Sequence, residues 1–177
     1  MVPMPDPVLA NRLAALATFL DDAVHAETDE LSPSAVAALQ SIRQDGPLAI
    51  QDVAKIIGLT HSATVRLIDR LEKDWLVRRL SRRGREVRVE VTARGRRRAS
   101  QFQDKRLAVA GGLIDALEPG ERLALAGILD KLLAASVSDH DGATRTCRSC
   151  EREGCRKVGC PVEAAARLLP PAPPPAR

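Results

Sequence analysis

A chain of 177 residues is long enough for one ordinary domain, or for one domain with an appendage. The apolar fraction of 45% can fill a core, but Phe19, Trp75 and Phe102 are the only aromatic residues, so an aromatic platform that stacks bases or sugars is not expected. No stretch is long and apolar enough to span a membrane, and the N-terminus lacks the pattern of a signal peptide, so we expect a cytoplasmic protein without a membrane partner.

The net charge of +4 is unevenly distributed along the chain. Residues 62–106 hold 15 Lys and Arg against 6 Asp and Glu, a local charge of +9, and the rest of the chain carries −5. A solvated charged face usually mixes the two signs more evenly. A basic block inside a folded segment therefore favours a polyanionic partner such as nucleic acid.

The first predicted elements are two helices that precede the basic block. After residues 1–7, which we expect to be disordered, apolar residues at helical spacing predict an amphipathic helix over 8–26; they are Leu9, Leu13, Leu16, Leu20 and Val24. The second helix has Ser32 as its N-cap and Pro33 at its first position, and it ends at Gly46.

A helix-turn-helix follows. A short helix over 50–57 ends at Gly58, and Thr60 caps the next helix, which runs through Trp75. One side of this helix is apolar and consists of Thr64, Leu67, Ile68, Leu71 and Trp75. The opposite side is polar at its start and basic further along, and consists of His61, Ser62, Val65, Arg66, Asp69, Arg70 and Lys73. Such a helix can place its start in the major groove of a duplex and its basic end against phosphates.

Two short strands, residues 77–80 and 87–91, predict a hairpin. Its tip carries three arginines whose charges repel one another unless an anion lies between them, as in a minor groove; they are Arg82, Arg83 and Arg85. A long helix then begins near Thr92, and a further helix follows the sequence EPGE. The fold class predicted is mainly α-helical: a winged helix-turn-helix with a two-stranded β wing, between flanking helices.

Several of these residues also have a simpler interpretation. His61 can be an exposed residue of the helix cap, Asp69 can pair with an arginine of its own helix or of the wing, and Arg66 can contact either a guanine edge or a phosphate. The arginines after Thr92 can be the exposed start of the long helix. The helix-turn-helix, the wing and the local charge of +9 coincide in one segment, however, and together they favour DNA.

Short motifs spread over residues 8–136 match a known pattern. They are the LSPS opening, GPL followed by DVAK and IGL, RLIDRLE followed by LV, and the V-x-V-T-x-x-G that starts the long helix. In these motifs the sequence resembles the MarR family of transcriptional regulators. The resemblance implies a DNA-binding lobe over about residues 32–92 and dimerisation helices over about 8–26 and 93–136. It also implies a homodimer whose two lobes lie on successive major grooves of a pseudo-palindromic operator.

The resemblance also implies roles for single residues. Arg66 lies where the recognition helix of that family meets the groove, with His61 and Ser62 before it, and Arg85 matches the wing arginine that enters the minor groove. Many relatives have an Asp two residues before that arginine, which orients it, whereas this chain has Arg83 there. The family further implies a small phenolic or lipophilic effector in a cleft between the dimerisation helices and the lobe, which Leu and Ala would line here.

All four cysteines lie in one segment, residues 147–163, after a polar linker over 137–146. Their spacing is C-x2-C-x4-C-x4-C, and they are Cys147, Cys150, Cys155 and Cys160. Four thiolates in so short a run can surround one Zn²⁺ at about 2.3 Å each, with Gly154 and Gly159 allowing tight loops. The segment resembles a zinc knuckle, with a cysteine in place of its histidine and arginines in place of its base-stacking aromatic residues. We therefore expect a structural zinc site.

Other interpretations of the cysteine segment stay open. Pro161 after the last cysteine is typical of iron–sulfur ligand runs, although the gaps differ from the ferredoxin pattern. The cysteines can also form a metal-free thiol switch or be inert. The basic residues between them should lower the pKa of the thiols; they are Arg148, Arg152, Arg156 and Lys157. A disordered, proline-rich tail is expected over 168–177.

The sequence therefore predicts a homodimeric, sequence-specific regulator of transcription that binds double-stranded DNA, with repression as its mode and a structural zinc site. One alternative is a redox- or metal-responsive regulator whose cysteine segment is the sensor. Another is an RNA- or protein-binding module that uses a knuckle. An enzyme is not expected, because no Ser–His–acid set or open metal site is visible and His25, His61 and His140 are scattered.

Overall fold

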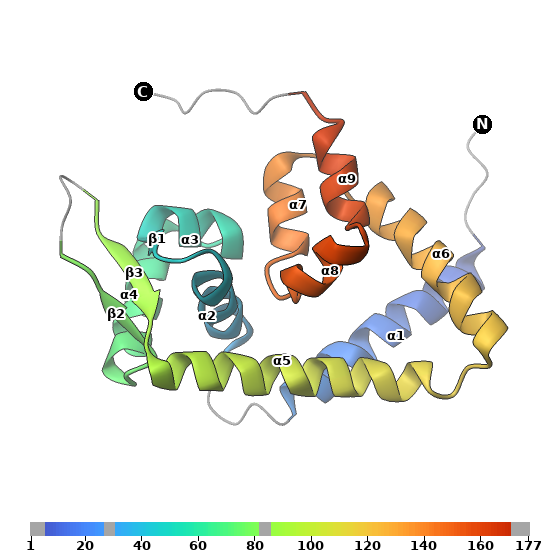
Figure 1. Cartoon of the computed structure of the whole chain (residues 1–177), viewed down its shortest axis with the longest axis horizontal. Coiled ribbons are helices and arrows are strands. Elements are labelled where there is room, and N and C mark those ends of the chain that lie inside the picture. The colour runs from blue at the N-terminus through green and yellow to red at the C-terminus, as the bar shows by residue number, and fades with distance from the viewer. Residues whose placement is uncertain (1–5, 27–30, 82–85, 171–177) are drawn as a thin grey trace.

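The computed structural model describes residues 6–26, 31–81 and 86–170. Its longest element is α5 (Ala93–Ile114), which runs along one side of the molecule (Figure 1). A lobe of helices and a small sheet lies at the start of α5, and α1 (Pro7–His25) and α6 (Pro119–Ala135) lie towards its far end. No helix among the described residues is both long and apolar enough to cross a membrane.

The lobe contains the expected helix-turn-helix. Its elements are α2 (Pro33–Asp45), β1 (Leu48–Ala49), α3 (Ile50–Ile57), α4 (His61–Lys73), β2 (Val77–Arg79) and β3 (Arg88–Val91). Three predicted local signals are confirmed. The side chains of Ser32 and Thr60 accept hydrogen bonds from the backbone N–H three residues on, and Gly58 takes the left-handed φ of 71° that ends α3. These signals fix where each helix begins and ends.

The sheet has three strands rather than the two that the sequence predicts. Their order is β1–β3–β2 and both pairings are antiparallel, with Leu48 opposite Val89 and Val77 opposite Val91. Sequence reasoning misses β1 because two residues are too few for an alternating pattern to show. The alternation predicted for β3 is confirmed, since Val89 and Val91 are buried and Arg88 is exposed.

One continuous core joins α2, α3, α4, the sheet and the start of α5. Its most deeply buried side chains include Leu39, Ile42, Val53, Ile68, Leu71, Val77 and Val89. Gly95 brings α5 into direct contact with the chain that leaves α4, because a Cβ at this position would lie 1.9 Å from Leu76 O. The first turns of α5 are therefore part of the lobe.

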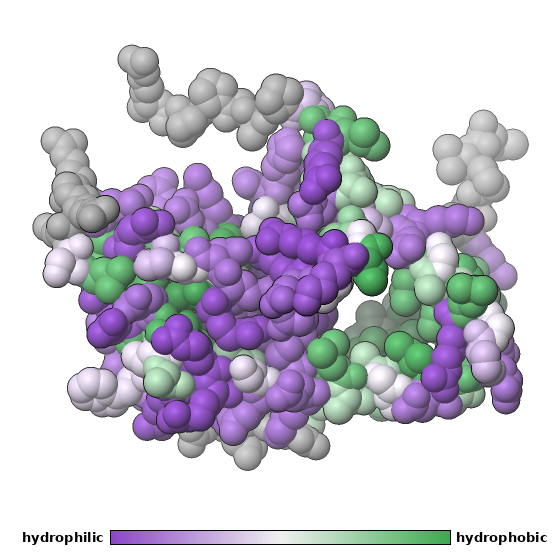
Figure 2. All heavy atoms as spheres, viewed as in Figure 1, coloured by the Kyte–Doolittle hydropathy of each residue, from purple (hydrophilic) through white to green (hydrophobic). Residues whose placement is uncertain are grey.

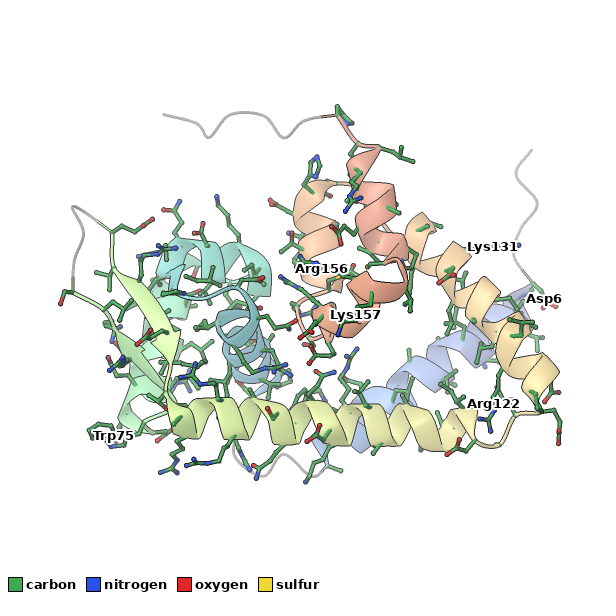
Figure 3. The ribbon with its side chains drawn as sticks, viewed as in Figure 1. Asp6, Trp75, Arg122, Lys131, Arg156 and Lys157 are labelled. Carbon is green, nitrogen blue, oxygen red and sulfur yellow. The ribbon has the colours of Figure 1, made fainter. Side chains whose placement is uncertain are left out.

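The position of Trp75 corrects the prediction for the apolar side of α4. The helix ends at Lys73, and Trp75 has a φ of 58° and a side chain that is 73% exposed (Figure 3). Hydrogen bonds from Trp75 N to Glu72 O and from Leu76 N to Leu71 O close the helix as a Schellman motif. This turn puts Leu76 in the core, at the place where helical spacing would put Trp75.

The segment predicted as a polar linker, residues 137–146, is helical instead. It contains α7 (His140–Thr146), whose N-cap Asp139 accepts a hydrogen bond from Gly142 N at 2.6 Å. Ala143 is buried, so the helix has a packed side although its sequence is almost entirely polar. The prediction was wrong because one small apolar residue carries no periodicity.

Two further short helices follow in the described part of the chain, α8 (Arg152–Val158) and α9 (Pro161–Arg167). α7 packs against α3, and α9 packs against α6, so the three helices α7–α9 lie between the lobe and α6 (Figure 1). Of the ends expected to be disordered, residues 1–5 and 171–177 lie outside the described part of the chain, and α1 already begins at Pro7.

The far end of the molecule exposes apolar side chains. Figure 2 shows hydrophobic residues gathered over α6, α1 and the far half of α5, whereas the visible face of the lobe is mostly hydrophilic. The large exposed apolar residues of these three helices include Leu9, Leu13, Leu16, Phe19, Leu107, Ile114, Leu123, Ile128, Leu129 and Leu132. The stripe predicted for α1 is therefore present, but within one chain only its end at Val24 is buried.

Candidate functional site

The exposed face of α4 carries the helix residues predicted to contact DNA. Ser62, Arg66 and Arg70 are exposed and follow one another at intervals of four residues, so they form one row along the helix. His61 is exposed at the first helical position, whereas Val65 is half-buried and packs against the core of the lobe. The structure thus brings these five residues to one side of α4, with its apolar side turned into the lobe.

The first turn of α4 adds backbone donors to this row. Thr60 Oγ1 accepts a hydrogen bond from Ala63 N at 3.3 Å and lies 3.3 Å from Ser62 Oγ. The first N–H groups of a helix have no partner within the helix itself, and the helix dipole makes this end favourable for an anion. Ser62 therefore stands where a phosphate oxygen can accept from both a hydroxyl and backbone N–H groups.

Ion pairs hold the strand after α4 against the helix. Arg79 of β2 lies 2.6 Å from Asp69 Oδ1, pairs with Glu72, and donates its backbone N–H to Glu72 Oε1 at 2.9 Å. Burial acts to lower the pKa of Arg79, but its bonds to the two carboxylates raise it overall. The pairing of Asp69 with an arginine of the wing strand is thus confirmed. It orients the base of the wing relative to α4.

The tip of the wing was predicted to carry Arg82, Arg83 and Arg85, and these three lie outside the described residues. Their contact with a minor groove stays a prediction. Basic side chains on the described neighbouring elements are exposed, namely Arg78, Arg88, Arg94, Arg96 and Arg97. Basic side chains are therefore exposed on α4, on β2 and β3 and at the start of α5, and Arg78 among them pairs with Glu90.

The four cysteines lie close together in the chain but on different elements. Cys147 follows α7, Cys150 lies in the loop before α8, Cys155 lies in α8, and Cys160 precedes α9. All four are free thiols, and only Cys155 is exposed. Gly159 has a φ of 93°, as a tight turn before the last cysteine requires, whereas Gly154 lies within α8 rather than in a loop.

The thiols influence one another and two arginines. A hydrogen bond with Cys147 lowers the pKa of Cys150 to about 6; burial acts against this, and the charges of Arg106 and Arg152 support it. The hydrogen bond with Cys150, burial and the neighbouring Cys160 raise the pKa of Cys147. Burial, followed by the charges of Cys150 and Cys160, raises the pKa of Cys155. The thiols therefore form one electrostatic cluster.

The basic residues between the cysteines do not all act as predicted. Arg152 is among the causes that lower the pKa of Cys150. Arg148 instead donates to Arg145 O, Arg156 pairs with Glu163 at 3.5 Å, and Lys157 pairs with Glu153 at 2.9 Å. The sequence analysis missed Arg106, because this arginine comes from α5 and no local pattern connects it to the cysteines.

The arrangement of the side chains is not that of a closed metal cage. Among the described residues, which include all four cysteines, no three or more His, Cys, Asp or Glu side chains form a group arranged to hold a metal ion. The chemistry of the donors still fits a thiophilic ion, because four thiols lie within one short segment and the neighbouring thiols affect each other's pKa. The zinc, iron–sulfur and thiol-switch interpretations all stay predictions.

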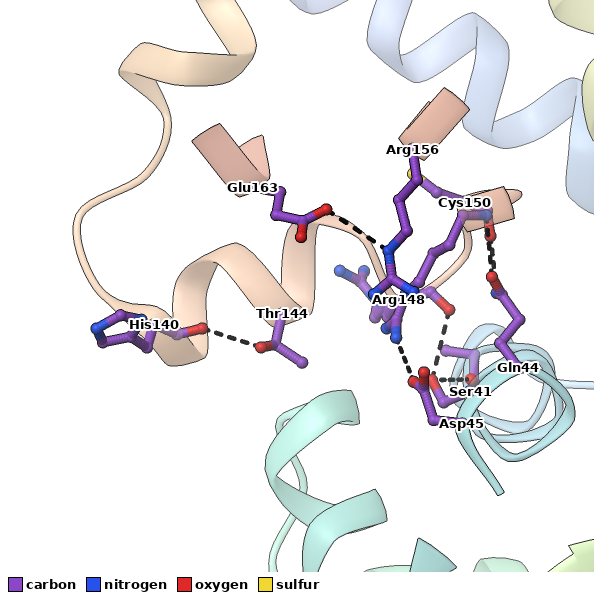
Figure 4. A network of polar contacts seen from close by, with 11 residues as sticks. Ser41, Gln44, Asp45, His140, Thr144, Arg148, Cys150, Arg156 and Glu163 are labelled. Carbon is purple, nitrogen blue, oxygen red and sulfur yellow. Dashed lines mark hydrogen bonds and ion pairs between the residues drawn. The ribbon is translucent and has the colours of Figure 1, made fainter. Parts of the chain in front are cut away.

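The loop that carries Cys150 is bound to the lobe by polar contacts (Figure 4). Gln44 of α2 donates from Nε2 to Cys150 O at 2.7 Å and accepts at Oε1 from Arg152 N at 3.0 Å. Arg43 pairs with Glu151 at 2.9 Å. These contacts join residues more than a hundred positions apart. Sequence reasoning missed them because Gln44 and its neighbours carry no motif.

A cavity of about 390 Å³ lies between α2 and α5. Its lining is apolar at Leu31, Val36, Leu39, Ala99 and Phe102, and charged at Arg98, Asp104 and Lys105. It lies between the lobe and α5, one of the helices expected to form a dimer, and the sequence analysis expected a small effector in such a cleft. The expected lining of Leu and Ala is incomplete, because an aromatic ring and two cations also border it.

Comparison with known proteins finds a family model that matches part of the lobe, and similar folds. Residues 31–84 match the model of the MarR family. YusO of Bacillus subtilis has a TM-score of 0.64 and 22% identity, over 71% of this chain and 92% of its own. MepR, a transcription regulator of the Staphylococcus aureus multidrug efflux pump MepA, has a TM-score of 0.61 and 18% identity, over 74% of this chain and 98% of its own. No curated protein matches the chain.

A further similar structure contains DNA. Streptococcus pneumoniae FabT in complex with DNA has a TM-score of 0.61 and 18% identity, over 72% of this chain and 94% of FabT. These likenesses show the winged-helix fold, and the match to the MarR family model lies within the lobe, at residues 31–84.

Proposed function

We propose that this protein is a sequence-specific regulator of transcription that binds double-stranded DNA as a homodimer. The observation that carries the proposal is the exposed row Ser62, Arg66 and Arg70, on the second helix of a helix-turn-helix in a MarR family domain. The likeness of the fold to FabT in complex with DNA supports it. Because of its role on DNA, we place the protein in the cytoplasm.

On the duplex, α4 enters the major groove with its N-terminal end. His61, Ser62 and the exposed part of Val65 face the groove, Arg66 contacts a guanine edge or fixes the register on a phosphate, and Arg70 lies against the backbone. The wing arginines Arg82, Arg83 and Arg85 contact the adjacent minor groove.

A second copy of the chain covers the exposed apolar surface at the far end of α5. Monomeric proteins rarely expose contiguous apolar patches of more than a few hundred Å², and here α1, α5 and α6 all contribute large exposed side chains. A two-fold dimer through these helices presents two lobes, which suits a pseudo-palindromic operator with half-sites about one helical turn apart. Such a dimer occupies promoter DNA and excludes other proteins, so we propose repression as its mode.

The dimer has a direct test in Leu129→Glu, which places a charge on the exposed apolar face of α6. We expect light scattering to give the mass of a dimer for the parent protein and of a monomer for the variant, because a buried unpaired carboxylate is strongly unfavourable. Lys131 is an exposed residue of the same helix, and the Lys131→Glu variant is the control, which should remain a dimer. A parent protein that is monomeric at micromolar concentration would contradict the homodimer.

The cavity between α2 and α5 is the place we propose for a small effector. Its apolar walls, with the charged groups of Arg98, Asp104 and Lys105 at the border, suit a molecule with an apolar body and a polar group. An effector bound there contacts both the lobe and α5, and so changes the separation of the two lobes of the proposed dimer.

We further propose that Cys147, Cys150, Cys155 and Cys160 hold one Zn²⁺, which when bound cross-links α7, α8 and α9. With four protein ligands the ion has no open position, so its role is structural rather than catalytic. An iron–sulfur cluster and a metal-free thiol switch are the alternatives. A knuckle that binds single strands is disfavoured, because Arg148 and Arg156 are bonded within the chain itself.

Selection of binding sites from a random duplex pool tests DNA recognition. We expect the full chain to enrich a two-part motif with half-sites about one turn apart, and to bind the enriched duplex more tightly than either of its single strands. Hydroxyl-radical footprinting should show two protected regions with the same spacing. No enrichment, or equal binding to single strands, would contradict the proposal.

A further inference from the structure

α7 lies against the first helix of the helix-turn-helix, beside the turn that leads into α4 (Figure 1). A Cβ atom on Gly58, the residue of this turn with a left-handed φ, would lie 3.6 Å from Arg145 Cδ. Ala54 lies one helical turn before Gly58 on the same side of α3, and it is buried although it belongs to neither cluster of core residues. α7 therefore adds to the surface of the lobe at this turn, and the side chain of Arg145 lies against it.

Contacts at the C-terminal end of α7 fix its place on the lobe. Gln44 of α2 donates from Nε2 to Cys150 O at 2.7 Å, and Arg43 of the same helix pairs with Glu151 at 2.9 Å. Both contacts hold the loop that directly follows α7. α7 is thus packed against α3 along its side and attached to α2 beyond its end. Arg145 therefore has a defined position relative to α4 and does not move with a free tail.

The positive charge of Arg145 is available to a ligand outside the chain. Among the described residues its guanidinium has one ion pair, with Asp139 at 3.9 Å, and the side chain is 43% exposed. An exposed ion pair at this distance contributes little to stability. Asp139 also accepts from Gly142 N at 2.6 Å and from Ser138 Oγ at 2.9 Å, so it keeps partners when Arg145 turns away. Arg145 can therefore exchange this pair for a phosphate, to which a guanidinium donates two parallel hydrogen bonds.

The turn at Gly58 is close to the DNA backbone when α4 lies in the major groove. In a helix-turn-helix the N-terminal end of the second helix meets the base edges, while the first helix crosses the backbone. Gly58 ends α3, and Thr60, two residues later, caps α4, so the turn joins these two parts of the contact. Lys55 of α3, three residues before Gly58, is exposed and adds a second cation near the turn. A side chain that lies against this turn is therefore next to the phosphates at the edge of the groove.

We propose that α7 is an additional DNA-contacting element, in which Arg145 binds a backbone phosphate at the edge of the major groove that α4 enters. The proposal rests on the DNA-binding function proposed above, and it adds a residue outside the part of the chain, residues 31–84, that matches the MarR family model. A phosphate contact carries no base information, so Arg145 adds affinity and fixes the orientation of the lobe without reading the sequence. The segment after α6 is then part of the DNA interface.

The first test measures the salt dependence of binding by the full chain. The probes are a fluorescent duplex of about 30 base pairs enriched from a random pool, which is long enough for two half-sites, and a scrambled duplex of equal length. Arg145→Ala should weaken binding to both duplexes by a similar factor of about 5, and should reduce the slope of log K against log salt concentration by about 1.

Two further variants show whether the effect comes from the charge at this position. Arg145→Lys keeps the charge and should retain the salt slope of the parent protein. Arg167→Ala removes one arginine from α9 in the same segment, and is the matched control that should change neither the affinity nor the slope. Circular dichroism checks that each variant is folded. A purely structural role of Arg145 would lower the affinity without a change in the slope.

The second test maps the phosphate itself by ethylation interference on the enriched duplex. Ethylation removes the negative charge of single phosphates, so each phosphate that contributes to binding is identified by position. Arg145→Ala should lose the interference at one position in each half-site and keep it at the others. Weaker interference at all positions alike would instead indicate a general loss of structure.

The outcomes separate the proposal from the DNA-binding function on which it rests. An unchanged salt slope in Arg145→Ala, a loss confined to the enriched duplex, or an interference pattern identical to that of the parent protein would each overturn the contact of Arg145 with a phosphate and leave DNA binding intact. Failure of the parent protein to bind any duplex would overturn the DNA-binding function, and the proposal with it.

Discussion

The helix-turn-helix lobe and the cysteine segment are both built from short helices, but they are stabilised in different ways. α4 is held by buried apolar residues such as Ile68 and Leu71, and its functional side chains point outward from a fixed support. The cysteine segment is held by hydrogen bonds and ion pairs to α2 and α5. The recognition helix therefore has a rigid apolar support, whereas the cysteine segment is attached mainly through polar contacts that can open locally at a lower free-energy cost.

Truncating one buried residue in each region tests whether the two regions are stabilised in different ways. Ile68→Ala in α4 should lower the free energy of unfolding by about 2–5 kcal/mol, because it leaves a cavity in a closed core. Val162→Ala in α9 should cost less, about 1 kcal/mol, because Val162 is buried but belongs to neither of the clusters of buried apolar residues and the substitution removes fewer carbon atoms. Urea denaturation followed by circular dichroism measures both. Equal losses would show that the cysteine segment is part of the same cooperative core.

The N-cap residues of α4 and α7 test whether the lobe and the cysteine segment unfold independently. Thr60→Ala removes the cap of α4 and should lower the free energy of unfolding of the whole lobe by about 1 kcal/mol. Asp139→Ala removes the cap of α7 and should leave the lobe unchanged, while amide hydrogens of α7 exchange faster. Hydrogen exchange measured by mass spectrometry distinguishes them. A loss of lobe stability in Asp139→Ala would contradict the independence of the two regions.

The smallest expected effect is the change in duplex affinity when a wing arginine is replaced. Arg83→Ala and Arg85→Ala should each weaken duplex binding and reduce the slope of log K against log salt concentration by about 1, because each removes a contact with the anionic backbone or groove. Anisotropy titrations at several salt concentrations give the slope. If neither variant changes it, the wing does not contact DNA.

The sequence predicts those structural features that depend on residues close together in the chain. Ser32, Gly58 and Thr60 act on their own neighbours, so helix ends and the helix-turn-helix follow from local patterns. Helical spacing predicts that Trp75 is in the core, whereas the structure places Leu76 there. The difference comes from the backbone turn at Trp75, which a helical pattern does not predict. β1 and α7 are too short or too polar to show a period.

The candidate sites show the same limit. The row on α4 follows from helical spacing once the helix is placed, so Ser62, Arg66 and Arg70 could be predicted. The support of the cysteine loop could not, because Gln44 and Arg106 become its neighbours only in the folded chain. Contacts that join distant segments leave no local pattern in the sequence.

The most direct test of the central claim is the affinity of Arg66→Ala for the enriched duplex and for a scrambled duplex of equal length. We expect a loss of about 1–3 kcal/mol on the enriched duplex and a smaller loss on the scrambled one, because Arg66 lies on the exposed row of α4 and should contact or position bases. Arg167→Ala, which removes the same charge from α9, should leave both affinities unchanged. Unchanged binding in Arg66→Ala would contradict the account, since α4 would then not be the surface that meets DNA.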